Sequence, residues 1–359
     1  MTTAHINRIV TGVPPHDGHE FFVKFARTLL TDPRARAVFD RFAVKAQIGH
    51  RYSFLAPASD PDGPSIDISG IYTRGKFPTT AERMKLYEKF APTLAVDTVT
   101  KLELGDEARR ITHVVTTSCT GMVAPGIEQD LIERCGLRTS VERTNIGFMG
   151  CYAAINALKL ARHIVRSEPE SRVLAVNLEL CSLHLQEAQT IEQLLSFLVF
   201  SDGCAASLVT AEPTGLAIDS FFAAMVPDTR SLITWKIRDI GFDMFLSGRV
   251  PGAISTGLAN VTSDILDGAS VDAIDLWAVH PGGRSVLDSV ENGLALGPDA
   301  LRASRDILQR FGNMSSATVM FVLESILASA QASSNKSQRG CAMSFGPGLT
   351  AETMLFHTV

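Results

Sequence analysis

The chain has 359 residues, of which 45% are hydrophobic and 20% charged, and its formal charge is −5. This apolar fraction is enough to bury a full core, and a mildly acidic chain lacks the charge footprint of a nucleic-acid-binding protein. The apolar run 194–200 is far shorter than the roughly 18 residues of a membrane-spanning segment, and the first residues lack the apolar stretch of a signal peptide. We therefore expect a cytoplasmic protein that binds neither nucleic acid nor membrane.

Short apolar runs of strand length alternate along the chain with segments of helix length. The strand-like runs lie at 111–116, 172–178, 204–210, 274–279 and 341–345, and the helical segments at 152–165, 286–294 and 316–330. Several of these runs are apolar on both faces, as strands covered by helices are. The alternation predicts an α/β fold with sheets between helical layers. The stretches 57–70 and 332–338 have the composition of surface loops.

Two pairs of segments suggest an internal duplication. Segments 111–121 and 274–283 each pass from an apolar strand into a loop of small residues. Segments 204–210 and 341–350 are each strand-like and lie next to a turn that contains glycine. These pairs indicate two related halves of the chain.

The six cysteines include no CxxC pair, so they predict neither a zinc site nor a thioredoxin-like motif. Cys151 follows the segment 147–150 and precedes the helical stretch 152–165. Small residues allow a tight turn there, and the positive end of a helix dipole favours thiolate over thiol. Cys151 is therefore a candidate nucleophile, and the alternative is a small core residue at a helix start.

A histidine and an asparagine lie in settings that suit the same chemistry. His280 follows the apolar strand 274–279 and precedes Pro-Gly-Gly, so it is expected at the strand's carboxyl end, where α/β folds place their sites. Asn313 opens an amphipathic helix through Phe321, Leu323 and Ile326. It is either a helix N-cap or an amide donor aimed at a developing oxyanion. Cys, His and Asn together form a recognisable set for thioester or acyl transfer.

Several segments resemble type III polyketide synthases, the chalcone synthase-like branch of the thiolase superfamily. The segments are GFMGCYAAINALKLA (147–161), FSDGCAASLV (200–209), WAVHPGGRSVLDSVENGLAL (277–296), FGNMSSATVMFVLES (311–325) and SFGPGLTAE (344–352). They follow the order of the family's motifs, and the combination of HPGG, GNMSS and FGPGLT is highly specific. Ser344 stands where plant members have glycine, a change that we expect to be tolerated.

The resemblance implies a five-layered αβαβα thiolase fold and a homodimer. It implies an N-terminal half, 1–213, that carries the nucleophile, and a C-terminal half, 214–359, that carries the catalytic histidine and asparagine. Cys151, His280 and Asn313 match the catalytic residues. Phe200 matches a gatekeeper between the CoA tunnel and the cavity.

The same alignment assigns further residues to the cavity. The second gatekeeper position falls at or near Met244, where plant members have phenylalanine, so the plant-type cavity shape is not expected. Cys119 matches a cavity-lining position and is read as a wall residue. The remaining residues expected in the cavity wall are Cys181, His184, Trp235 and Ser315. Lys45 and Arg51 resemble the family's basic segment at the mouth of the CoA tunnel, or are ordinary solvated charges.

The implied reaction is iterative decarboxylative Claisen condensation. The Cys151 thiolate would accept the acyl group of an acyl-CoA starter, and His280 and Asn313 would stabilise the enolate that forms when malonyl-CoA loses carbon dioxide. Cyclisation would then release a pyrone or a resorcinol- or phloroglucinol-type ring. No cofactor or metal is expected beyond the CoA thioesters that serve as substrates.

Three alternatives remain at this stage. A ketoacyl-ACP synthase III-like enzyme shares the triad and fold but performs one condensation with an acyl carrier protein, and HPGG followed by FGNMSS argues against it. A papain-like cysteine protease shares the order Cys…His…Asn, but the later motifs have no role in a protease. A non-catalytic thiolase-fold scaffold would be expected to lose a triad member, and none is missing. The starter acyl group, the number of extensions, the mode of cyclisation and delivery by a carrier protein are left open.

Overall fold

The computed structural model describes residues 2–188, 190–332 and 337–359. In these residues a nine-stranded mixed sheet has the order β11-β12-β13-β8-β1-β7-β6-β4-β5. The strands are β1 (His5–Gly12), β4 (His113–Ser118), β5 (Glu142–Gly147), β6 (Val173–Leu180), β7 (Asp202–Thr210), β8 (Leu216–Met225), β11 (Leu276–Val279), β12 (Arg339–Gly346) and β13 (Thr350–Thr358). Only two residue pairs, His5 with Ala217 and Ile6 with Leu216, join β1 to β8, so the sheet divides into two parts there.

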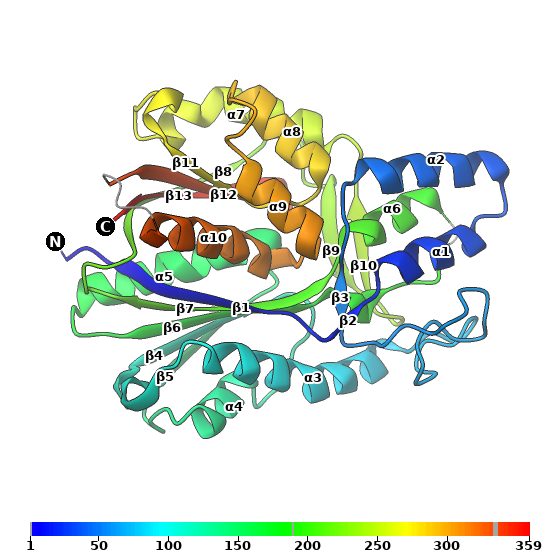
Figure 1. Cartoon of the computed structure of the whole chain (residues 1–359), viewed down its shortest axis with the longest axis horizontal. Coiled ribbons are helices and arrows are strands. Elements are labelled where there is room, and N and C mark those ends of the chain that lie inside the picture. Colours follow the sequence, from blue (N-terminus) through cyan, green and yellow to red (C-terminus); the bar gives the residue numbers. More distant parts are fainter. Residues whose placement is uncertain (1, 189, 333–336) are drawn as a thin grey trace.

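Helices separate and cover these two parts (Figure 1). Between them lie α5 (Ala153–Ser167) and α10 (Thr318–Ala332). Outside the part that contains β4 to β7 lie α3 (Thr80–Thr100) and α4 (Ile127–Arg134). The opposite outer layer contains α7 (Val250–Ile265) and α8 (Arg284–Gly293), with α9 (Arg302–Phe311) beside it. The predicted αβαβα sandwich is thereby confirmed.

The two parts of the sheet repeat one pattern of strand directions. β4 and β6 are parallel, and β7 and β1 follow in antiparallel pairs. β11 and β12 are likewise parallel, and β13 and β8 follow in antiparallel pairs. This pattern matches β4 with β11, as the first predicted segment pair suggested. It matches β7 with β13 and β12 with β6, so the pairing of segment 204–210 with 341–350 is wrong.

The two central helices, α5 and α10, contact the sheet on both sides, so many of their side chains are buried. Four alanines of α5 and the run Val319–Leu323 of α10 are fully or almost fully buried. Alanine lets the helix backbone approach both sheets closely, since its side chain is one methyl group. The prediction that the helix after Asn313 is amphipathic is wrong, because a helix in the middle layer has no solvent-facing side along its first turns.

A small lobe lies at one end of the layers, on the right in Figure 1. It consists of α1 (His19–Leu29), α2 (Pro33–Lys45), α6 (Ile191–Val199), the hairpin of β9 (Ile233–Ile237) with β10 (Phe242–Leu246), and the short β2 (His16–Asp17) and β3 (Tyr52–Ser53). The Asp32 side chain caps α2, and Pro33 follows at its first turn. The lobe has its own aromatic core, which includes Phe22, Phe25 and Phe39.

The predicted elements are all present, with small shifts at their ends. The strand-like runs correspond to β4, β6, β7, β11 and β12, and the helical segments to α5, α8 and α10. Segment 57–70 is irregular, and the predicted loop 332–338 falls partly outside the described residues. None of the helices in the described residues is long and apolar enough to cross a bilayer.

Candidate active site

Two of the three predicted catalytic residues, Cys151 and Asn313, lie together at helix starts, and His280 follows a strand whose next loop accepts a hydrogen bond from Asn313 at Gly282. Cys151 lies in a short 3₁₀ turn, η2 (Gly150–Tyr152), at the start of α5. His280 directly follows β11, and Asn313 precedes a second 3₁₀ turn, η5 (Ser315–Ala317), at the start of α10. Because α5 and α10 occupy equivalent places in the repeated pattern, their N-terminal ends meet. The Cys151 sulfur lies 3.7 Å from the Ser315 hydroxyl, and the Asn313 side chain also forms a hydrogen bond with the Cys151 sulfur.

A constrained turn presents Cys151. Gly150 has φ +79°, and a Cβ at this position would lie 2.3 Å from Cδ of Pro347. The N–H of Gly150 donates to the Cys119 sulfur at 3.0 Å. Only glycine satisfies both the backbone angle and the space, so the small residue before the nucleophile is a geometric requirement.

The thiol of Cys151 is not ionised in the ligand-free site. Burial raises its pKa to about 12, although hydrogen bonds from Ser315 and Asn313 oppose the shift. This differs from the sequence-based expectation that the helix terminus favours thiolate. Desolvation of the charged form outweighs the helix dipole here, so ionisation requires a partner that accepts the proton.

His280 is the candidate proton acceptor. It is only 1% exposed, and neither ring nitrogen has a hydrogen-bond partner among the described residues. Burial lowers its pKa to about 3, so the imidazole is neutral at physiological pH. Buried polar atoms without a partner are rare in native proteins and indicate a group that completes its bonding with a ligand.

The side chain of Asn313 is held in one orientation. Its oxygen accepts the N–H of Ser315 at 2.8 Å, and its amide nitrogen donates to the Gly282 carbonyl at 3.1 Å. The cap-like bond to Ser315 and the amide-donor role are therefore compatible. Because the amide group carries two N–H bonds, the second remains available on the side of Cys151.

A mostly apolar cavity opens in front of Cys151. Seven of the predicted residues line it: Cys119, Cys151, Cys181, Phe200, Trp235, Met244 and Ser315. Trp235 Nε1 donates to the Cys119 carbonyl at 2.7 Å, which fixes the indole in the wall.

His184 lies behind this wall and is fully buried. It donates through Nε2 to the Thr120 carbonyl at 2.6 Å and accepts at Nδ1 from the N–H of Phe242 at 3.0 Å. Both ring nitrogens are therefore used within the protein. The structure places His184 as a support for Thr120, which lines the cavity.

Two buried carboxyl groups near the site were not singled out from the sequence. Glu179 accepts hydrogen bonds from the Cys119 N–H and the Thr120 hydroxyl, each at 2.9 Å, and from the Ser316 hydroxyl at 2.6 Å. Asp202 accepts from the Ser182 N–H and hydroxyl. Burial raises the pKa of each carboxyl to about 7. Glu179 lies near the end of the buried strand β6, and Asp202 begins the buried strand β7. Any structural carboxylate could occupy such positions, so the sequence carries no distinguishing signal.

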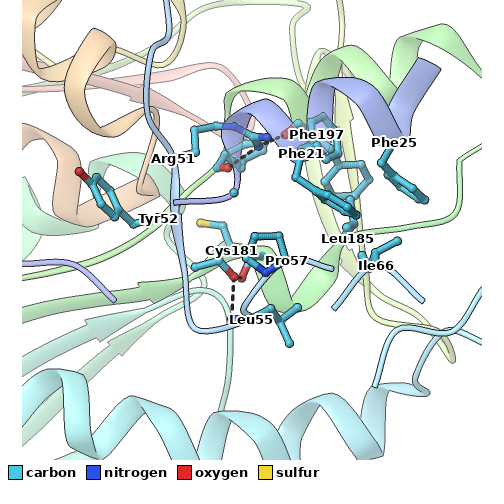
Figure 2. Close-up of a pocket in the computed structure, with 15 residues that line it drawn as sticks. Phe21, Phe25, Arg51, Tyr52, Leu55, Pro57, Ile66, Cys181, Leu185 and Phe197 are labelled. Carbon is cyan, nitrogen blue, oxygen red and sulfur yellow. Dashed lines mark hydrogen bonds between the residues drawn. The ribbon is translucent and has the colours of Figure 1, made fainter. Parts of the chain in front are cut away.

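A second cavity lies in the small lobe (Figure 2). It shares Cys181, Phe197 and Phe200 with the catalytic cavity. Its other apolar lining comes from α1, from the loop after β3 and from the segment after β6: Phe21, Phe22, Phe25, Leu55, Pro57, Ile66 and Leu185. The sequence does not reveal this cavity, because the phenylalanines of α1 have the spacing of an ordinary core face.

The two basic residues predicted at the CoA entrance have different surroundings. Lys45 is exposed at the end of α2, and its carbonyl accepts a hydrogen bond from Arg284. Arg51 is only 7% exposed, and its guanidinium donates to the carbonyls of Phe197 and Phe200. Arg51 is therefore neither a solvated charge nor an exposed group at an entrance.

Two family models together match most of the chain. Residues 10–213 match the family model described as chalcone and stilbene synthases, N-terminal domain, and residues 217–359 match the corresponding C-terminal domain. The chain is 33% identical to the alpha-pyrone synthesis polyketide synthase-like Pks18 of Mycobacterium tuberculosis, over 100% of this chain and 92% of that protein.

Solved structures are similar over the whole chain. One is PKS-I from the brown alga Ectocarpus siliculosus, with a TM-score of 0.89, 29% identity and coverage of 100% of this chain and 99% of that one. Another is the C-terminal type III polyketide synthase domain of Steely1, a type I/III hybrid from Dictyostelium, with a TM-score of 0.88, 25% identity and 99% coverage of each chain.

Proposed function

Since this chain belongs to the chalcone and stilbene synthase family and is a type III polyketide synthase, we propose that it builds an α-pyrone from malonyl-CoA and an acyl-CoA starter with an apolar chain. The observation that carries the proposal is the cavity in front of Cys151 and its apolar neighbour behind Cys181. The relative Pks18, named for alpha-pyrone synthesis, supports the class of product.

In the first step His280 accepts the thiol proton of Cys151, and the sulfur attacks the thioester carbonyl of the starter. The acyl group moves to Cys151, and CoA leaves as its thiol with a proton. The imidazole can accept the Cys151 proton because it starts neutral, although the burial that lowers its pKa opposes protonation. The resulting thiolate and imidazolium stabilise each other, which offsets the desolvation that each would suffer alone.

In the second step His280 and Asn313 donate hydrogen bonds to the thioester oxygen of malonyl-CoA. Loss of carbon dioxide leaves the electron pair as an enolate, whose oxygen these donors stabilise in a site that excludes water. The enolate carbon attacks the acyl group on Cys151 and expels the thiolate. The lengthened chain, now on CoA, returns to Cys151 for the next extension. In the last step an enol oxygen attacks the thioester carbonyl, which closes the pyrone and expels the thiol with the enol proton.

The apolar lining of the second cavity suits the far end of a hydrocarbon chain. Burying each methylene group contributes about 0.8 kcal/mol to binding, whereas a charged or strongly polar starter would lose its hydration there. Lys45, exposed on α2, would contact the phosphates of CoA at the entrance. The chain would act as a homodimer, for which the uncovered edge strand β5 provides a surface.

The proposal is tested by mass spectrometry of the products from malonyl-CoA and a panel of acyl-CoA starters. The chain should yield pyrones whose mass follows the starter, and Cys151→Ala should yield none. Cys135→Ala is the matched control, because Cys135 is half-buried at the end of α4, away from both cavities. Failure with every CoA thioester, together with a single condensation on malonyl-ACP, would instead indicate a ketoacyl-ACP synthase III-like enzyme.

A further inference from the structure

The C-terminal end of α6 lies inside the protein, where its last carbonyl groups need hydrogen-bond donors. The final carbonyls of any helix have no partner within the helix. The Nη1 group of Arg51 donates to the carbonyl of Phe197 at 2.8 Å and to that of Phe200 at 2.9 Å. A cation at this end also interacts favourably with the helix dipole. Arg51 therefore acts as the cap of α6.

Arg51 is itself fixed from several sides. Its Nε donates to Nδ1 of His19 at 2.9 Å, and its backbone N–H donates to a carboxylate oxygen of Asp17 at 3.1 Å. The guanidinium carbon lies 4.4 Å from the centre of the Phe22 ring. No carboxylate within the described ranges forms an ion pair with Arg51. Its N–H groups instead donate to the carbonyls of Phe197 and Phe200 and to His19.

The two phenylalanines whose carbonyls bind Arg51 are part of the wall between the two cavities. We call Cys181, Phe197 and Phe200 the partition, because all three line both cavities. Figure 2 shows Arg51 beside Phe197 at the edge of the second cavity. A Cβ on Gly312 would lie 2.9 Å from Cγ of Arg51, so the arginine stem also packs against the segment that leads to Asn313.

We propose that Arg51 is a positioning residue that holds Phe197 and Phe200 in the partition and thereby determines which acyl chains extend into the second cavity. This inference rests on the proposed function, since it needs an acyl starter. It differs from the earlier expectation of a CoA contact, because the guanidinium points to two carbonyls inside the protein. Without this cap the end of α6 loosens, the two phenylalanines change position, and discrimination by chain length is lost.

The test compares steady-state kinetics for hexanoyl-CoA and dodecanoyl-CoA in the full chain and in three variants. For Arg51→Met the ratio of the two kcat/KM values should change by about tenfold, as expected when two buried carbonyls lose their donor. The change should lie mainly in the starter KM, while the KM for malonyl-CoA stays the same. Arg51→Lys, which keeps the charge and one donor, should restore part of the ratio. His19→Ala, which removes only the bond to Nε, should give a smaller shift in the same direction.

Arg172→Lys is the matched control, because Arg172 is another buried arginine, 7% exposed on its side chain, that pairs with Glu107 and Glu212 away from both cavities. It should lower the thermal midpoint without changing the ratio. A ratio within twofold of the parent in folded Arg51→Met would overturn the inference, as would an equal rise in KM for every CoA thioester. If Arg51→Met does not fold, a ratio within twofold of the parent in both Arg51→Lys and His19→Ala would overturn it. If the parent chain makes no starter-dependent product, the proposed function fails instead.

Discussion

At the scale of single residues, burial decides the charge of the catalytic groups. Burial raises the pKa of the Cys151 thiol to about 12 and lowers that of the His280 imidazole to about 3. Both groups are therefore neutral before substrate binds. The motifs predict which residues take part in catalysis. Their charge states depend on how completely the surrounding layers exclude water, which no local segment encodes.

Asn313→Ala should separate the two halves of the reaction. Removing one donor to a developing oxyanion costs about 100- to 1,000-fold in rate, so decarboxylation of malonyl-CoA should fall by that factor. Transfer of the starter to Cys151, followed as the acyl adduct by intact-protein mass spectrometry, should persist. Asn292→Ala, at an exposed position of α8, serves as the control. An unchanged rate of carbon dioxide release in Asn313→Ala would contradict the assigned role.

Glu179 should make stability fall as pH rises. Its folded-state pKa is raised from 4.5 to about 7, so between these values the native carboxyl keeps a proton that the unfolded chain has lost. The contribution of Glu179 to the free energy of unfolding should decrease through this window by roughly 3 kcal/mol and change little above it. Urea unfolding at several pH values should show this as a stability difference between the parent and Glu179→Gln that shrinks as pH rises. The same slope in Glu179→Gln as in the exposed control Glu88→Gln would refute the prediction.

At the scale of elements, the turn before α5 shows how a loop residue positions a nucleophile. Gly150→Ala should weaken both stability and activity, because an added Cβ meets Pro347 and the backbone has φ +79°. Gly136→Ala separates these causes, since Gly136 has φ +71° but open space around its Cβ position.

Calorimetry and kcat should therefore distinguish the two variants. Gly136→Ala should cost about 1 kcal/mol with kcat unchanged, whereas Gly150→Ala should cost more and reduce kcat at least tenfold. Equal effects of the two substitutions would mean that the contact with Pro347 does not position Cys151.

The elements also show where sequence patterns mislead. The run after Asn313 was expected to be amphipathic, but α10 lies in the middle layer and its first two turns are buried. The division into two related halves could be predicted from segments 111–121 and 274–283, because these segments contain the equivalent strands β4 and β11 and the loops that follow them. The other pair failed since glycine-containing turns follow many strands and do not identify topological equivalents.

At the scale of the whole molecule, the free edge of the sheet predicts association. β5 is exposed along most of its length, and Met122 and Met149, 57% and 36% exposed, lie in loops that follow the parallel strands β4 and β5. An uncovered edge with apolar residues beside it favours pairing with a second chain.

Sedimentation should therefore give a dimer of the 38.7 kDa chain. Met122→Glu should shift it toward monomer, because the new charge would be buried in the contact. Ile68→Glu, at a position 72% exposed in a loop of the small lobe, is the control. A parent chain that stays monomeric at all concentrations would exclude the homodimer.

The sequence by itself determined the layered α/β architecture, the family, and the three residues assigned to catalysis, whose roles remain predictions. It did so because alternating apolar runs and the motifs around Cys151, His280 and Asn313 are local patterns. Tertiary structure alone decided the second cavity, the burial of Arg51 and the raised pKa values of Glu179 and Asp202. Each of these depends on segments far apart in the chain, such as α1, the strand β3 and the end of α6, whose contacts create the empty space and remove the water.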